Sequence, residues 1–138
     1  FSGATILPVF HAIDEVGIEI VVNANEQSCA FAAGGYSRSS DEVGVAVVTS
    51  GPAITNTLSA VADANADSIP LLVFAGQVAQ GQMGTDVFQT IDVVSVFKDA
   101  AKKVILLTEL QDEMINFAGA FLNRVEREVS WAKRENNK

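Results

Sequence analysis

Two short stretches of this chain carry residues that could do acid–base or binding chemistry, and the first contains Glu26. This carboxylate follows a β-branched run at residues 18–23 and opens a helical pattern over residues 25–38 that is almost entirely small or apolar. Such a helix packs tightly, so a carboxyl group at its start loses part of its water. Desolvation favours the neutral form and lets the group exchange a proton near neutrality. The structural alternative is an acid placed at a helix start by the helix dipole.

The second stretch is Thr-Ser-Gly-Pro-Ala-Ile-Thr-Asn at residues 49–56. It follows an unbroken apolar run over residues 43–48, which predicts a strand buried on both faces. Ligands in open α/β sheets bind at the carboxyl ends of strands. Gly51 permits a backbone shape that other residues resist, and Pro52 suits the first turn of a helix. The free N–H groups after Pro52 could therefore bind a polar ligand edge.

The elements that must position these residues follow from hydrophobic periodicity and turn signals. Strands alternate with helices, which predicts a parallel sheet covered by helices on both faces, a three-layer α/β/α fold. We expect one domain over residues 1–138, structured from about 3 to 130, with a charged tail at 131–138. The predicted helices are residues 6–16, 25–38, 56–66, 90–97 and 109–129; the predicted strands are 18–23, 43–48, 71–75 and 103–107.

The composition excludes several classes of function. A formal charge of −8 over 138 residues leaves no basic stripe for nucleic acid. No apolar run is long enough to cross a bilayer, so we expect no membrane partner. Cys29 is the single cysteine, which excludes an intrachain disulfide and favours a reducing, cytoplasmic compartment. His11 is the only histidine and has no partners for a catalytic triad, and we predict no metal site in this chain.

Taken together, the ordered motifs resemble the pyrimidine-binding domain of the thiamine diphosphate enzymes, most closely its acetolactate synthase branch. The resemblance runs from Gly3 to about Phe117. From these 138 residues we expect a domain without the helix and first strand that the family has before the Gly3 turn. The motifs that carry it are Gly3-Ala4-Thr5-Ile6-Leu7-Pro8, Asn25-Glu26-Gln27, Ala30-Phe31-Ala32-Ala33-Gly34-Gly35-Tyr36-Ser37-Arg38, residues 47–56, Asp67-Ser68-Ile69-Pro70, Ala75-Gly76-Gln77-Val78 and Gly84-Thr85-Asp86-Val87-Phe88-Gln89.

The resemblance implies a role for each matching residue. Glu26 is similar to the family's activating glutamate, which hydrogen-bonds N1′ of the aminopyrimidine and favours the imino tautomer that deprotonates the thiazolium. The resulting carbanion attacks a 2-oxo acid, which loses carbon dioxide, while the protein supplies orientation and proton control. The other matches are the pyrimidine-pocket residues Thr49, Pro52 and Asn56, the catalytic Gln89 near the reacting centre, and the substrate-side residues Phe88 and Lys102.

The same resemblance implies a missing half of the site. The sequence has no Gly-Asp-Gly motif with a downstream Asn to hold Mg²⁺ and the diphosphate. We therefore expect a separate domain to hold both and the isolated chain to be inactive. As its protein partner we expect a second copy of this chain in a homodimer, or a chain that carries the diphosphate-binding domain. Whether the chain is a natural subunit, a fragment or a truncated gene product stays open, as do the identity of the 2-oxo acid and the use of FAD.

Two other functions remain open from the sequence. A freestanding homologue that has lost catalysis would act as an interaction or dimerisation module. A flavodoxin-like nucleotide binder would use the turn at residues 49–56, although neither of the usual glycine-rich nucleotide motifs is present.

Overall fold

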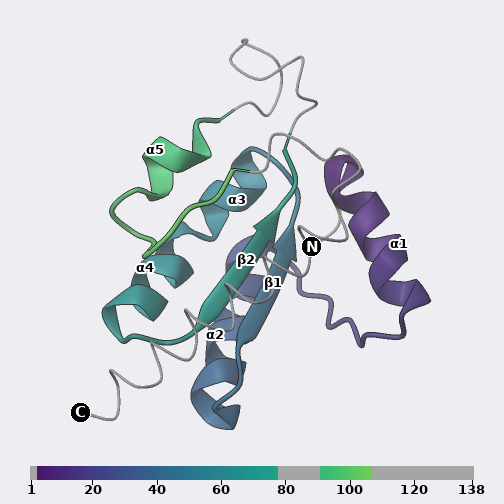
Figure 1. Ribbon diagram of the computed structural model, residues 1–138, viewed down its shortest axis with the longest axis horizontal. Helices are drawn as coiled ribbons and strands as arrows, with labels where there is room; N and C mark the ends of the chain where they lie inside the picture. The colour runs from purple at the N-terminus through teal and green to yellow at the C-terminus, as the bar shows by residue number, and fades with distance from the viewer. Residues whose placement is uncertain (1–2, 78–90, 107–138) are drawn as a thin grey trace.

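A parallel pair of strands organises the computed structural model, which describes residues 3–77 and 91–106 (Figure 1). Strand β1 (Gly44–Val48) pairs with β2 (Leu71–Ala75), with Gly44 opposite Leu71 and Val48 opposite Ala75. Helix α2 (Glu26–Ser40) precedes β1, and helices α3 (Pro52–Asn56) and α4 (Leu58–Ala66) connect the two strands. Helices joined to parallel strands in this way confirm the predicted α/β class.

Burial alternates along β1, as expected for a strand with one covered face. Gly44, Ala46 and Val48 are buried, whereas the side chain of Val45 is 52% exposed. Helices α2, α3 and α4 and the short helix α5 (Val93–Phe97) supply the core residues that pack on the covered face. The described residues thus cover one face of β1, where the apolar run had predicted burial on both.

Small residues bring α2 close to the sheet. Cys29, Ala30 and Ala33 of α2 pack with Ala46 of β1 and Ala60 of α4. At Gly44, an added Cβ would collide with the carbonyl oxygen of Ala33. The small-residue helix predicted from the sequence is therefore confirmed, and its close approach requires glycine at the start of β1.

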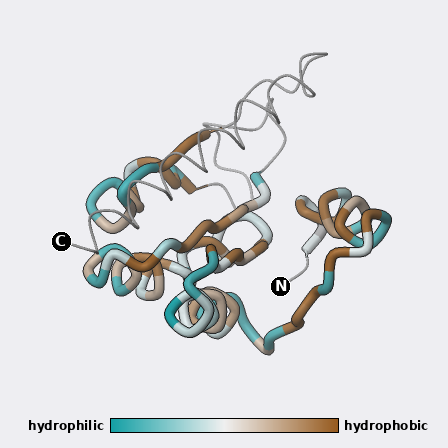
Figure 2. The backbone as a smooth tube through the Cα atoms, turned by 60° about the horizontal axis from the view of Figure 1, so that its bottom comes forward, coloured by the Kyte–Doolittle hydropathy of each residue, from teal (hydrophilic) through white to brown (hydrophobic). Residues whose placement is uncertain are grey.

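The N-terminal part of the chain packs differently. A 3₁₀ turn η1 (Ala4–Ile6) leads into α1 (Leu7–Glu15), which contains no buried residue. The strand predicted at residues 18–23 is wrong: this stretch is not a strand, and Val21 and Val22 are 74% and 79% exposed. Figure 2 shows it as a hydrophobic connection between α1 and α2. β-Branched residues favour a strand only where neighbours on a sheet receive them.

Other boundaries also differ from the sequence prediction. The helix predicted at residues 56–66 corresponds to α4, but Asn56 ends the separate helix α3. Thr57 lies between the two helices and donates its hydroxyl hydrogen to the carbonyl oxygen of Ile54 at 2.7 Å. Residues 103–106 form no strand, and α5 is shorter than the predicted helix at 90–97. Residues 78–90 and all of the helix predicted at 109–129 lie outside the described residues. In the ranges described, no helix has the length and apolarity needed to traverse a bilayer.

Candidate functional site

Glu26 is the first residue of α2, as the sequence predicts. Asn25 caps this helix with an extended backbone, and its side-chain oxygen accepts a hydrogen bond from the Ser28 N–H at 2.8 Å. The cap begins the helix at one defined residue, so the carboxyl group of Glu26 stands in its first turn. Glu26 is only 8% exposed, which is unusual for a carboxylate unless it is paired or hydrogen-bonded.

The partner of Glu26 comes from a different helix. Nδ2 of Asn56, the last residue of α3, donates a hydrogen bond to Oε2 of Glu26 at 3.0 Å. The part of the chain that the structure describes offers no second side-chain donor to the other oxygen, Oε1. The site therefore contains a buried carboxyl group with one oxygen held and one oxygen available.

Helix α2 runs into the start of β1, so its first turn, which carries Glu26, lies at the carboxyl end of the strand. The turn after β1 lies at this same end. Gly51 has φ 64° and ψ −123°, in the left-handed half of the Ramachandran map that glycine adopts without strain. Pro52 then occupies the first turn of α3, as predicted. At about 1.5 Å of rise per residue, Pro52 and Asn56 are about 6 Å apart along the helix.

The ends of both strands meet the start of the chain. The N–H of Gly76 donates to the carbonyl oxygen of Val48 at 3.0 Å, which holds the two strand ends together. Across them, the hydroxyl oxygens of Thr5 and Thr49 lie 2.9 Å apart. An added Cβ at Gly3 would collide with the Thr49 side chain, and one at Gly76 with the Thr5 hydroxyl. The turn at residues 49–51 is thus closed on one side by residues 3–5.

Comparison with known proteins identifies the family of this chain. Residues 1–96 match the family described as thiamine pyrophosphate enzyme, N-terminal TPP binding domain. The chain belongs to this family.

Relatives of this N-terminal TPP binding domain include acetolactate synthase large subunits. That of Buchnera aphidicola is 38% identical over 122 residues, which cover 88% of this chain and 21% of the relative. The isozyme 2 large subunit of Escherichia coli is 38% identical, with 88% and 22% covered. The large subunit of Lactococcus lactis is 42% identical, with 81% and 20% covered. The chain thus spans about a fifth of the length of these relatives.

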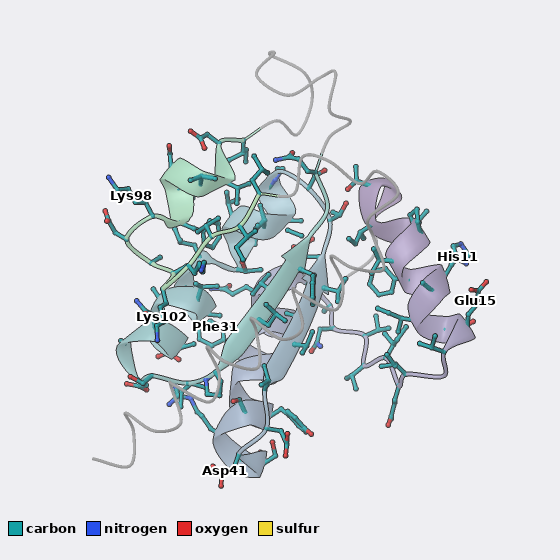
Figure 3. All side chains as sticks on the ribbon, in the orientation of Figure 1. His11, Glu15, Phe31, Asp41, Lys98 and Lys102 are labelled. Carbon is teal, nitrogen blue, oxygen red and sulfur yellow. The ribbon has the colours of Figure 1, made fainter. Side chains whose placement is uncertain are left out.

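The structure of this TPP-binding domain brings four predicted site residues to one end of the fold. Glu26 and Asn56 are in contact, Thr49 is buried after β1, and Pro52 is exposed at the start of α3. Lys102 is exposed in the segment after α5, and Figure 3 shows it and Lys98 on the side of the molecule opposite His11 and Glu15. Phe88 and Gln89 lie outside the described residues, so their roles stay predictions, as does that of Lys102.

Sequence reasoning did not single out Thr5 as a site residue. Its hydroxyl contact with Thr49 joins residues 44 positions apart, which no local pattern indicates. The available signal was the motif at residues 3–8, which opens the first helix and was used only to support the resemblance. No group of three or more His, Cys, Asp or Glu is placed to hold a metal ion within residues 3–77 and 91–106.

Proposed function

We propose that this chain is the pyrimidine-binding part of an acetolactate synthase-type enzyme that decarboxylates or condenses 2-oxo acids with thiamine diphosphate. The observation that carries the proposal is the Glu26 carboxyl group, 8% exposed, with Oε2 held by Asn56 and Oε1 available. Its support from relatives is the match to acetolactate synthase large subunits, which extends over most of this chain.

The donor set fits the edge of an aminopyrimidine. Buried polar atoms are almost always hydrogen-bonded, so the available Oε1 of Glu26 calls for a partner that the described residues do not provide. A ring nitrogen can share a proton with a carboxyl oxygen, and such a bond is stronger at the buried Glu26 because little water competes for it. Bound thiamine diphosphate supplies the carbon nucleophile of the reaction. Glu26 would hold the proton shared with N1′, while Thr49 and Pro52 would line the ring's pocket.

A second domain must complete this site. The chain carries a formal charge of −8, and its described residues place no carboxylate cluster for Mg²⁺. A diphosphate brings further negative charge, which Mg²⁺ normally neutralises through carboxylates and water. We therefore assign Mg²⁺ and the diphosphate to a separate domain outside these 138 residues. Cys29 is free and buried, and a reducing compartment such as the cytoplasm belongs to the proposal.

Binding by this chain alone tests the first step. Thiamine, which lacks the diphosphate, is titrated into ¹⁵N-labelled protein, and amide shifts are followed. We expect the largest shifts at the start of α2 and around residues 49–56, and their loss in Glu26→Gln. Shifts spread elsewhere, or unchanged by the substitution, would contradict the assigned site.

Activity tests the complete proposal. The chain is mixed with a chain carrying a diphosphate- and Mg²⁺-binding domain, together with thiamine diphosphate, Mg²⁺ and pyruvate, and released carbon dioxide is measured. Glu26→Gln should suppress the release, because the amide cannot hold the shared proton. Glu19→Gln is the matched control: it removes an exposed carboxylate and should leave the rate unchanged.

One observation favours a second candidate function, an interaction or dimerisation module without catalysis. The apolar stretch at residues 18–22 is exposed, with Ile18 at 60% and Val22 at 79%. Exposed apolar stretches often mark protein interfaces. Sedimentation velocity of the wild type against a Val21→Lys, Val22→Lys variant distinguishes the two functions. Two results together would favour the module: the double variant abolishes the assembly, and Glu26→Gln leaves any measured rate of carbon dioxide release unchanged.

A further inference from the structure

We propose that Asn56 is a positioning residue that determines which oxygen of Glu26 meets the ligand and carries its proton. The inference rests on the proposed function of Glu26, but its first test needs no cofactor. Its basis is the 3.0 Å hydrogen bond from Nδ2 of Asn56 to Oε2 of Glu26. The sequence resemblance placed Asn56 among the residues that line the pyrimidine pocket, whereas the geometry directs its amide to the carboxyl group instead.

The chemistry of the two groups makes this contact directional. Nδ2 of an asparagine can only donate hydrogen bonds, so Oε2 must act as the acceptor whether Glu26 is charged or neutral. In the neutral carboxylic acid, the oxygen that accepts is the carbonyl oxygen and the other oxygen carries the proton. Asn56 therefore assigns the exchangeable proton of Glu26 to Oε1, the oxygen that the described residues leave available.

Helix α3 holds Asn56 in place for this task. Ala53 and Ile54 are buried beneath the helix, and Thr57 directly after Asn56 is fully buried. The Thr55 hydroxyl donates to the carbonyl oxygen of Pro52 at 2.9 Å, and the Thr57 hydroxyl to that of Ile54 at 2.7 Å. These contacts fix the backbone of the helix, so the Asn56 amide reaches Glu26 from a rigid support.

Asn56 itself contributes little to the core. The residue is exposed, so its replacement leaves no cavity and no buried backbone group without a partner. Its most specific contact is the one with Glu26, 30 positions away in the chain. A substitution at Asn56 should therefore change the carboxyl group's orientation while the fold persists.

The first test follows the side-chain NH₂ signals of Asn56 by ¹⁵N–¹H NMR during a pH titration of this chain. We expect both signals to move in a single step as the Glu26 carboxyl group titrates, and the step to vanish in Glu26→Gln. The signals of Asn65, an exposed asparagine on α4, serve as the internal control and should not show that step. Asn56 signals that ignore Glu26 would overturn the inference and leave the proposed function of Glu26 standing.

The second test is catalytic and uses the reconstituted assembly. Asn56→Ala frees Oε2, and Asn56→Asp places a second carboxylate against it. We expect both variants to lower the maximal rate on the order of tenfold and to change the pH profile, with Asn56→Asp affected more. The control Asn65→Asp adds the same charge on an exposed helix face and should leave the profile unchanged. Circular dichroism establishes that each variant is folded.

The outcomes separate the two proposals. If Glu26→Gln abolishes the rate while a folded Asn56→Ala retains the wild-type rate and pH profile, the positioning role fails and the function stands. If Glu26→Gln itself has no effect, the proposed function fails. A uniform loss of stability without a changed pH profile would mean that Asn56 only joins the two helices.

Discussion

Helices α1 and α2 differ in a way that their compositions do not suggest. α1 is rich in large apolar residues such as Leu7, Val9 and Phe10, yet it buries none of its residues. α2 consists largely of Ala, Gly and Ser and buries six, including the polar Glu26 and Ser37. Small side chains allow α2 to approach the sheet closely. The burial of α2 therefore depends on how near its backbone comes to the sheet rather than on large apolar side chains.

The contrast defines two regions. The packed unit comprises β1, β2 and helices α2 to α5, whose two apolar clusters meet on one face of the sheet. The N-terminal arm comprises residues 7–24, which carry exposed Leu7, Val16, Ile18 and Val21. The candidate site belongs to the packed unit, whereas the most exposed large apolar residues that the structure describes, Val16, Val21 and Val22, belong to the arm. Substitutions of the same kind should consequently have unequal effects in the two regions.

The largest effect is expected from enlarging a buried alanine in α2. Ala30 is fully buried among Cys29, Ala46 and Ala60, so Ala30→Leu forces α2 away from the sheet. We expect a loss of about 1–3 kcal/mol in the free energy of unfolding, measured with urea. The matched control Ala32→Leu adds the same side chain on the exposed face of α2 and should be close to neutral. Equal effects at both positions would remove the distinction between the two faces.

A direct comparison of the regions uses one substitution in both. Val48→Thr places a hydroxyl group in a fully buried site and should cost about 1–3 kcal/mol. Val21→Thr makes the same change at a residue 74% exposed in the arm and should stay within about 0.5 kcal/mol. A cost at Val21 as large as that at Val48 would mean that residues 18–23 pack as the strand that their sequence predicts.

A smaller effect is expected where α2 and α4 are joined at the surface. Arg38 binds Asp67 at 2.7 Å and Asp63 at 2.8 Å, and these hydrogen bonds raise the pKa of its guanidinium group. Arg38→Ala should lower the unfolding temperature slightly, and Arg38→Lys less, because lysine keeps the charge without the two-pronged geometry. Thermal scans in about 1 M salt should show the difference between variants shrinking. A salt-independent difference would point to packing by the arginine stem instead.

The smallest effect concerns α5 at the edge of the packed unit. The Asp92 carboxylate accepts hydrogen bonds from the Ser95 hydroxyl and the Ser95 N–H, which lower the pKa of Asp92 below its ordinary value. A lowered pKa in the folded state contributes stability above the ordinary aspartate pKa, and this contribution is lost as pH falls through the folded value. Asp92→Asn should therefore differ from the wild type near neutrality and converge with it in acid. Unfolding temperatures measured across pH check this, with the exposed Asp99→Asn as control.

Local patterns predicted the packed unit well. The apolar runs located β1 and β2, the small-residue pattern located α2, and Gly51-Pro52 located the turn into α3. These features depend on residues close in the chain. They also placed Glu26 at the start of a helix, so the key carboxyl group of the candidate site was accessible from sequence.

The remaining features depend on partners far along the chain. Residues 18–23 have the composition of a strand, but composition does not supply the neighbouring strand that a sheet requires. The bond between Asn56 and Glu26 spans 30 positions, and that between Thr5 and Thr49 spans 44. Which side chains meet at such distances follows from the packing of helices on the sheet, and no periodicity in the sequence records it.

Gly3 and Gly76 should tolerate substitution far less than exposed positions of this chain do. Each leaves no space for even a methyl group beside the threonine opposite it, Thr49 for Gly3 and Thr5 for Gly76. A library randomised at both positions and selected for correctly folded protein should return glycine at each. Positions 21 and 22, whose side chains are mostly exposed, should accumulate almost any residue in the same selection.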